Sequence, residues 1–96
     1  MSSRRIELQL PPADGFVRLQ AACAQIGKVK EVNEATRSLL GAVPSGPLRS
    51  LTPALLRMSV LTGPDGISSV VEIEGQATVD PYGYERKAID KLIAAI

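Results

Sequence analysis

"ALLRMSVLTGPDGISSVVEIEGQA", residues 54–77, contains the clearest structural pattern in this chain. Polar and apolar residues alternate on both sides of GPDG (63–66), and such alternation around a Gly-containing turn is typical of a β-hairpin. We predict two antiparallel strands joined by this four-residue loop, with Thr62 opposite Ile67.

The predicted register separates the hairpin into an apolar face and a polar face. The expected cross-strand pairs are Met58–Val71 and Leu56–Ile73 on the apolar face, and Arg57–Glu72 and Ser59–Val70 on the polar face. Apolar neighbours then pack together on one side, and an ion pair forms on the other. Because a slip by one residue exchanges the two faces, the pattern predicts a sheet with one face in the core.

Before the hairpin, the sequence predicts a strand, a helix and two shorter strands. RRIELQL (4–10) alternates and stops at two prolines, as a half-buried strand does. The helix is expected to have Asp14 as its N-cap and to end at Gly27, with apolar residues at helical spacings. These residues are Phe16, Leu19, Cys23 and Ile26. KVKEVN (28–33) and TRSLLGAV (36–43) are expected to be strands joined by a short turn.

The stretch DPYGYERKAIDKL (80–92) predicts the beginning of a long C-terminal helix. Asp80 caps free backbone N–H groups and Pro81 fits the first helical turn, although a start one or two residues after the proline also satisfies the pattern. One apolar stripe follows, made of Ala88, Ile89, Leu92, Ile93, Ala95 and Ile96. The centre of this stripe passes through Glu85, so we expect this carboxylate to point toward the sheet.

The opposite side of the C-terminal helix is polar. Lys87, Asp90 and Lys91 lie off the apolar stripe, and we expect them to be solvated. Arg86 and Asp90 are four residues apart, which is the spacing of a surface ion pair on a helix.

Two interpretations of Glu85 follow from its position. In the first, the residue sits in the first turn, where the helix dipole favours a negative charge and water still reaches it. In the second, Glu85, Tyr82 and Tyr84 line the mouth of a ligand-binding cleft between the sheet and the helix. The irregular run PSGPLRSLTP (44–53) is then a lid over this cleft, and otherwise it is an ordinary surface loop.

Composition limits the classes of function. We expect the 96 residues (1–96) to form one domain. The 11 basic and 10 acidic residues give a net charge of +1 without a basic block, so we expect no nucleic-acid partner. No apolar run approaches the roughly 18–20 residues of a membrane span. The N-terminus MSSRRIELQL enters a strand pattern without an apolar signal segment. We therefore expect a cytoplasmic protein that does not enter membranes.

The chain has one cysteine and no histidine. A disulfide within the chain, a Ser–His–acid triad and a Cys–His pair are thereby excluded. Cys23 lies in the middle of an apolar stripe, so we expect a buried small hydrophobe rather than a reactive thiol. Scattered acidic residues without a Cys/His cluster predict no metal site and no cofactor, and we assign no catalytic residue.

The predicted order is β-α-β-β-β-β-α, an α+β domain with an antiparallel sheet of about five strands and two helices on one face. This order resembles the repeat of the TATA-binding protein and, in reduced form, the START-type lipid-binding domains. IGKVKEVNEATRSLLGAV (26–43), LTPALLRMSVLTGPDGISSVVEIEGQA (51–77) and RKAIDKLIAAI (86–96) look more specifically like small uncharacterised bacterial single-domain proteins with this TATA-binding-protein-like layout. The resemblance implies the fold and assigns no site.

The uncovered face of the sheet decides between the functions that remain. Its expected polar residues are Arg5, Glu7, Gln9, Arg57, Ser59, Glu72, Glu74 and Gln76. This slightly acidic mixture lacks the cationic surface and the apolar wedges that DNA binding by such a sheet requires. Leu55, Leu61 and Val70 interrupt the charges, and edge strands invite pairing. We therefore expect a non-enzymatic interaction module that self-associates, such as a homodimer; the alternative is a binder of a small apolar or amphipathic ligand between the sheet and the C-terminal helix.

Overall fold

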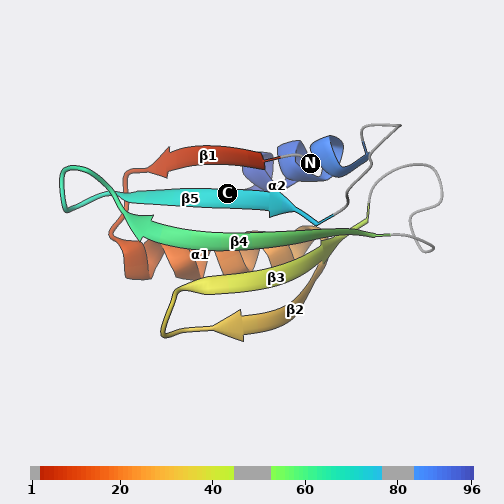
Figure 1. Ribbon diagram of the computed structural model, residues 1–96, viewed down its shortest axis with the longest axis horizontal. Coiled ribbons are helices and arrows are strands. Elements are labelled where there is room, and N and C mark those ends of the chain that lie inside the picture. The colour runs from red at the N-terminus through yellow and green to blue at the C-terminus, as the bar shows by residue number, and fades with distance from the viewer. Residues whose placement is uncertain (1–2, 45–52, 77–83) are drawn as a thin grey trace.

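The computed structural model describes residues 3–44, 53–76 and 84–96. These residues form, in chain order, β1 (Ser3–Leu8), α1 (Pro12–Ile26), β2 (Lys28–Asn33), β3 (Ser38–Val43), β4 (Ala54–Thr62), β5 (Ser69–Gly75) and α2 (Tyr84–Ala95). The strands make one antiparallel sheet with the spatial order β1-β5-β4-β3-β2 (Figure 1). The predicted α+β class and the predicted order of elements are confirmed.

Both helices cover the same face of the sheet. In Figure 1, α1 crosses behind the middle strands and α2 lies behind the β1 side of the sheet. Their apolar residues pack with those of the strands into one core, made of Phe16, Leu19, Ala22, Cys23, Leu39, Val43, Leu56, Met58, Val60, Val71, Ile73, Ala88, Ile89 and Leu92. The prediction of two helices on one face is therefore confirmed, and no described helix covers the other face.

Helix α1 begins with prolines and not with Asp14. Pro11 is the N-cap residue and Pro12 occupies the first helical position, where its fixed φ suits the helix and its missing N–H costs nothing. Asp14 lies inside the first turn, so its prediction as the N-cap was wrong, but its charge still favours the positive end of the helix dipole. Gly27 ends the helix as predicted, and its N–H donates a hydrogen bond of 2.9 Å to the Cys23 carbonyl oxygen.

The β4–β5 hairpin has a register two residues away from the predicted one. Thr62 pairs with Ser69 and not with Ile67, so the loop is longer than four residues. The Asp65 carboxylate accepts hydrogen bonds from the N–H groups of Ile67 and Ser68 and from the Ser68 hydroxyl, which holds these two residues in the loop. Because side chains in a strand alternate with a period of two, the shift leaves every side chain on its predicted face.

The shifted register changes the cross-strand partners. The pairs toward the helices are Leu56–Gly75, Met58–Ile73 and Val60–Val71, and the pairs on the uncovered face are Arg57–Glu74, Ser59–Glu72 and Leu61–Val70. The predicted pairing of Arg57 with Glu72 was therefore wrong. Glu72 forms its ion pair on the other side of β5, where the Arg5 guanidinium of β1 lies 2.5 Å from its carboxylate.

The β2–β3 hairpin closes through a turn that begins at Asn33. The Asn33 side-chain oxygen accepts hydrogen bonds from the N–H groups of Ala35 at 3.1 Å and Thr36 at 3.3 Å. Arg37 has a positive φ of 49°, the left-handed conformation that completes the turn. Because the turn uses these residues, β3 begins at Ser38, two residues later than predicted.

Helix α2 presents the predicted apolar stripe to the sheet. Ala88, Ile89 and Leu92 are buried, whereas Lys87, Asp90 and Lys91 are exposed, as predicted. The predicted helix start at Asp80–Pro81 lies outside the described residues. Asp90 pairs with Arg4 of β1 at 2.9 Å and not with Arg86, so its ion pair connects the helix to the sheet.

Replacing Asp65 by alanine is expected to remove a pH-dependent part of the stability. Backbone hydrogen bonds from Ser68 and Ile67 hold the pKa of the Asp65 carboxyl below its usual value of 3.8. A group with a lower pKa in the folded state stabilises the fold above its unfolded-state pKa and loses this effect as the pH falls through its folded-state pKa. The difference in free energy of unfolding between wild type and Asp65→Ala should therefore be larger at about pH 7 than at about pH 2.

Urea unfolding at the two pH values measures this difference. Glu34→Ala removes an exposed acidic residue from the turn of the other hairpin and controls for the change in net charge. Its difference from wild type should change much less with pH. A difference between wild type and Asp65→Ala that stays constant across this range would show that the loop carboxylate does not act in this way.

Candidate functional site

Glu85 lies in the first turn of α2 (Tyr84–Ala95), and its side chain points toward the sheet. The residue is 3% exposed. Its carboxylate rests on the backbone of Gly75 at the end of β5, so closely that a Cβ at position 75 would overlap it. The inward direction predicted for Glu85 is confirmed, and its burial argues against the interpretation in which water still reaches the carboxylate.

The other members of the predicted cleft are two tyrosines and a lid. Tyr84 is the first described residue of α2 and precedes Glu85 directly in the chain. Tyr82 and residues 45–52 of the predicted 44–53 lid lie outside the described residues. A ligand site built from Glu85, Tyr82 and Tyr84 therefore stays a prediction.

The face of the sheet opposite the helices carries two rows of polar side chains that run across the strands. The first row contains Ser3, Glu74, Arg57, Leu40 and Glu31, and the second contains Arg5, Glu72, Ser59, Ser38 and Asn33. Acidic and basic residues alternate in the first row, apart from Leu40, and the second row has one acidic residue, Glu72, next to one basic residue, Arg5. The face is therefore polar, as predicted, without being strongly cationic or anionic.

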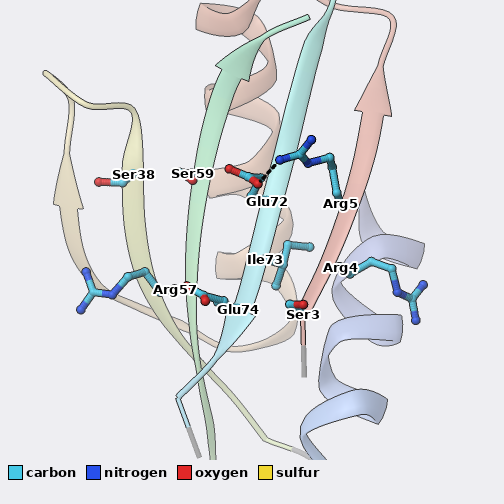
Figure 2. Close-up of a pocket in the computed structure, with 9 residues that line it drawn as sticks. All are labelled: Ser3, Arg4, Arg5, Ser38, Arg57, Ser59, Glu72, Ile73 and Glu74. Carbon is cyan, nitrogen blue, oxygen red and sulfur yellow. Dashed lines mark hydrogen bonds and ion pairs between the residues drawn. The ribbon is translucent and has the colours of Figure 1, made fainter. Parts of the chain in front are cut away.

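A depression of about 710 Å³ lies over these rows, between β1 and β3. Figure 2 shows Arg5 directed at Glu72 and Arg57 extended away from Glu74, across β3. Arg57 also lines a second depression, of about 430 Å³, together with Glu31 of β2. Among the described residues Arg57 forms no ion pair, so its guanidinium is available to a partner on this face.

The groups on this face are suited to hydrogen bonds and ion pairs. Within the ranges 3–44, 53–76 and 84–96, no group of three or more Cys, Asp or Glu residues is arranged to hold a metal ion. Cys23 lies on the other side of the sheet, where it is completely buried and its Sγ is 3.8 Å from the Lys28 carbonyl oxygen. Burial raises the pKa of the Cys23 thiol, so this residue is the packing group predicted from the sequence.

Three large apolar side chains are exposed along the sheet. Leu55 and Leu61 of β4 are 41% and 43% exposed on the polar face, and Val32 of β2 is 44% exposed. The first two are expected from the sequence, but Val32 is not. A bulge between Val29 and Glu31 interrupts the alternation in β2 and puts Val32 on the helix side of the sheet. The signal in the sequence is the spacing of three between the two valines, which a regular strand cannot place on one side.

In the part of the chain that the structure describes, neither helix is both long and apolar enough to cross a bilayer.

Comparison with known proteins gives a structural neighbour but no family. No protein-family model matches the chain, and no curated protein matches its sequence. A solved structure of a protein from Nitrosospira multiformis, a structural-genomics target, is similar over 98% of this chain and 91% of the neighbour, with a TM-score of 0.67 and 11% identity. At this identity the likeness shows the fold alone: a bacterial protein shares this α+β architecture.

Gly75→Ala is expected to destabilise the protein, because the added methyl group overlaps the Glu85 carboxylate. Overpacking of this kind lowers the free energy of unfolding by about 1–3 kcal/mol. In a Glu85→Ala background the overlap is absent. The loss in free energy of unfolding caused by Gly75→Ala should therefore be smaller there by at least about 1 kcal/mol. Urea unfolding of the four proteins of this double-mutant cycle measures the coupling. If Gly75→Ala lowers the free energy of unfolding equally in both backgrounds, the contact between Gly75 and the Glu85 carboxylate is contradicted.

Proposed function

We propose that the protein is a non-enzymatic interaction module that associates with itself through its uncovered sheet. The observation that carries the proposal is a five-stranded sheet with both helices on one side, so that among the described residues one face of the sheet and the outer edge of β2 have no cover. Leu55 and Leu61 are exposed on the uncovered face, and Val32 is exposed at the β2 edge, on the helix side. Exposed apolar side chains next to open strand edges mark contact surfaces.

The overall charge of the chain permits such contact. With 11 basic and 10 acidic residues the net charge is +1, so two copies do not repel each other strongly. The polar rows nevertheless restrict how the copies meet. Stacking two uncovered faces would bury Arg5, Arg57, Glu72 and Glu74, and burying charged groups is costly unless they are completely paired. The strand edges avoid this cost, since backbone groups then make the contact while charged side chains keep their water.

The resemblance to the TATA-binding protein repeat concerns the arrangement of strands and helices. It does not extend to DNA binding. On the uncovered face, Arg5 and Arg57 stand against Glu7, Glu72 and Glu74, whereas phosphate binding needs an excess of cations. A cytoplasmic location belongs to the same proposal, since a chain with one buried cysteine needs no oxidising compartment.

Self-association should appear as a mass that depends on concentration. Light scattering coupled to size-exclusion chromatography is expected to show the mass of one chain at about 1 µM and to approach twice that mass at several hundred micromolar, because a small interface gives micromolar affinity or weaker. High salt should change the equilibrium only modestly, since the charges on the sheet are balanced. A strict monomer over the whole range would overturn the proposal.

A second candidate function, binding of a small apolar or amphipathic ligand between the sheet and α2, is favoured by the buried carboxylate of Glu85. A carboxylate in such a place orients a polar head group. Gly75 occupies the space directly beside the carboxylate, so we rank this candidate second.

The ligand hypothesis predicts that gently purified protein carries a small molecule. Native mass spectrometry should then show a mass excess that is lost on denaturation and reduced in Glu85→Gln. Glu74→Gln, which changes an exposed carboxylate of the sheet, is the matched control and should retain the excess. Native spectra that contain only the chain mass would rule this candidate out.

A further inference from the structure

Strand β2 is an edge strand of the sheet, and its outer edge is open. Helix α1 contacts the beginning of the strand, where the Cys23 Sγ lies 3.8 Å from the Lys28 carbonyl oxygen, and in Figure 1 the arrowhead end of the strand projects beyond the helix. Most of its residues are exposed, and on its helix side Val29 is half-buried while Val32 is 44% exposed. An end strand with an exposed apolar side chain is a template for pairing with a further strand.

The opposite end strand, β1, is already engaged. Arg4 forms an ion pair with Asp90 of α2 at 2.9 Å, and Arg5 forms one with Glu72 at 2.5 Å. Helix α2 also lies along the β1 side of the molecule (Figure 1). In contrast, the charged residues of β2 form no ion pair within the described ranges. A second strand therefore reaches β2 with fewer contacts to displace.

The bulge in β2 sets the side of the sheet on which each residue lies. Lys28 and Val29 pair with Ala42 and Gly41 of β3, and Glu31, Val32 and Asn33 pair with Leu40, Leu39 and Ser38. Lys30 is the extra residue of the bulge. As a result, Val29 and Val32 both lie on the helix side, whereas Lys28, Glu31 and Asn33 lie on the uncovered side.

We propose that two copies of the chain pair through β2, antiparallel and about a two-fold axis normal to the sheet. Val29 of one copy lies opposite the partner's Val32, and Lys28 lies opposite the partner's Asn33. The two sheets form one continuous sheet with all helices on the same side. This inference rests on the proposed self-association and specifies its geometry.

The bulge selects this register. Residues that lie opposite each other in an antiparallel pair point to the same side of the sheet. Val29 and Val32 are three residues apart, and only the extra residue between them puts both on one side. A shift by one residue in either direction sets helix-side residues opposite residues of the uncovered side. The selected register is also the one that overlaps all six residues of β2.

The charges at the centre of the pair are complementary. Lys30 and Glu31 flank the two-fold axis, so Lys30 of each copy lies next to the partner's Glu31. Both residues are exposed in the single chain. Opposite charges in neighbouring cross-strand positions stabilise a strand pair, and like charges there destabilise it. Two features of β2 therefore suit pairing with a second copy: its charges are complementary, and its two valines lie on the same side of the sheet.

Disulfide formation between Val29→Cys and Val32→Cys chains, produced separately, tests the pairing. Opposite residues have Cα atoms about 4.5–5.5 Å apart, within the range of a disulfide. The two copies of either position are separated by about 10 Å along the strand, which is beyond this range. Mild oxidation of the mixture should therefore give a crosslinked dimer, and oxidation of either variant alone should not. Cys23 is fully buried and stays outside the reaction.

Charge reversal gives a second, independent measurement. Glu31→Lys should raise the dissociation constant about tenfold, because it replaces two attractive contacts at the axis by two repulsive ones. The double change Lys30→Glu with Glu31→Lys exchanges the charges and should restore the affinity. Glu7→Lys makes the same charge change on β1 and is the matched control, with an expected change of no more than about twofold. Sedimentation velocity measures all four proteins.

The outcomes separate this inference from the function on which it rests. A monomer at every concentration would overturn both. A dimer that gives no crosslink in the mixture, or that responds to Glu7→Lys and not to Glu31→Lys, would overturn the β2 pairing and leave self-association through another surface. A crosslink in the mixture together with rescue by the double charge exchange would establish the pairing, because a loss of folding cannot produce either result.

Discussion

The apolar contact between one face of the sheet and both helices holds the strands and helices of this protein together. Leu56, Met58, Val71 and Ile73 are almost inaccessible to water at its centre. Burying one such side chain stabilises the fold by about 1.5–3 kcal/mol. With three aromatic residues in the chain, this core is assembled mainly from aliphatic side chains, and it needs cover from both helices. Neither described helix is left to cover the opposite face.

The same contact determines what the polar groups near it do. Glu85 begins the stripe of α2 that faces the sheet, so its carboxylate is carried inward together with the apolar residues behind it. Gly75 accepts it because a residue without a Cβ leaves room at the end of β5. On the uncovered face, in contrast, acidic and basic residues lie on neighbouring strands and remain in contact with water. The helix side of the sheet is thus buried and mainly apolar, whereas the uncovered side is hydrated and carries most of the charged residues of the strands.

The open margin of the sheet follows from the size of the helix layer. Helix α1 supports the middle strands and α2 supports the β1 side, and the arrowhead end of β2 projects beyond both (Figure 1). The bulge in this strand turns Val32 to the helix side, where it stays exposed. A bulge usually protects an end strand from pairing with other proteins. In the pairing proposed above, the bulge also puts the valines of two copies on the same side of the sheet, because the extra residue is present in both copies.

The residue pattern was enough to predict the elements, the core-facing sides of both helices and of β4 and β5, and the inward direction of Glu85, because periods of 2 and 3.6 residues assign side chains to sides. The bulge in β2, which turns Val32 to the helix side, was not predicted. The pattern did not determine the β4–β5 register, since registers two residues apart give the same faces; in the structure the longer loop is held by hydrogen bonds to the Asp65 carboxylate. The pairing of Asp90 with Arg4, 86 residues away, and the bare margin at β2 were decided by the tertiary structure alone. Both depend on which strands become neighbours, and that is a non-local property that no local pattern of residues encodes.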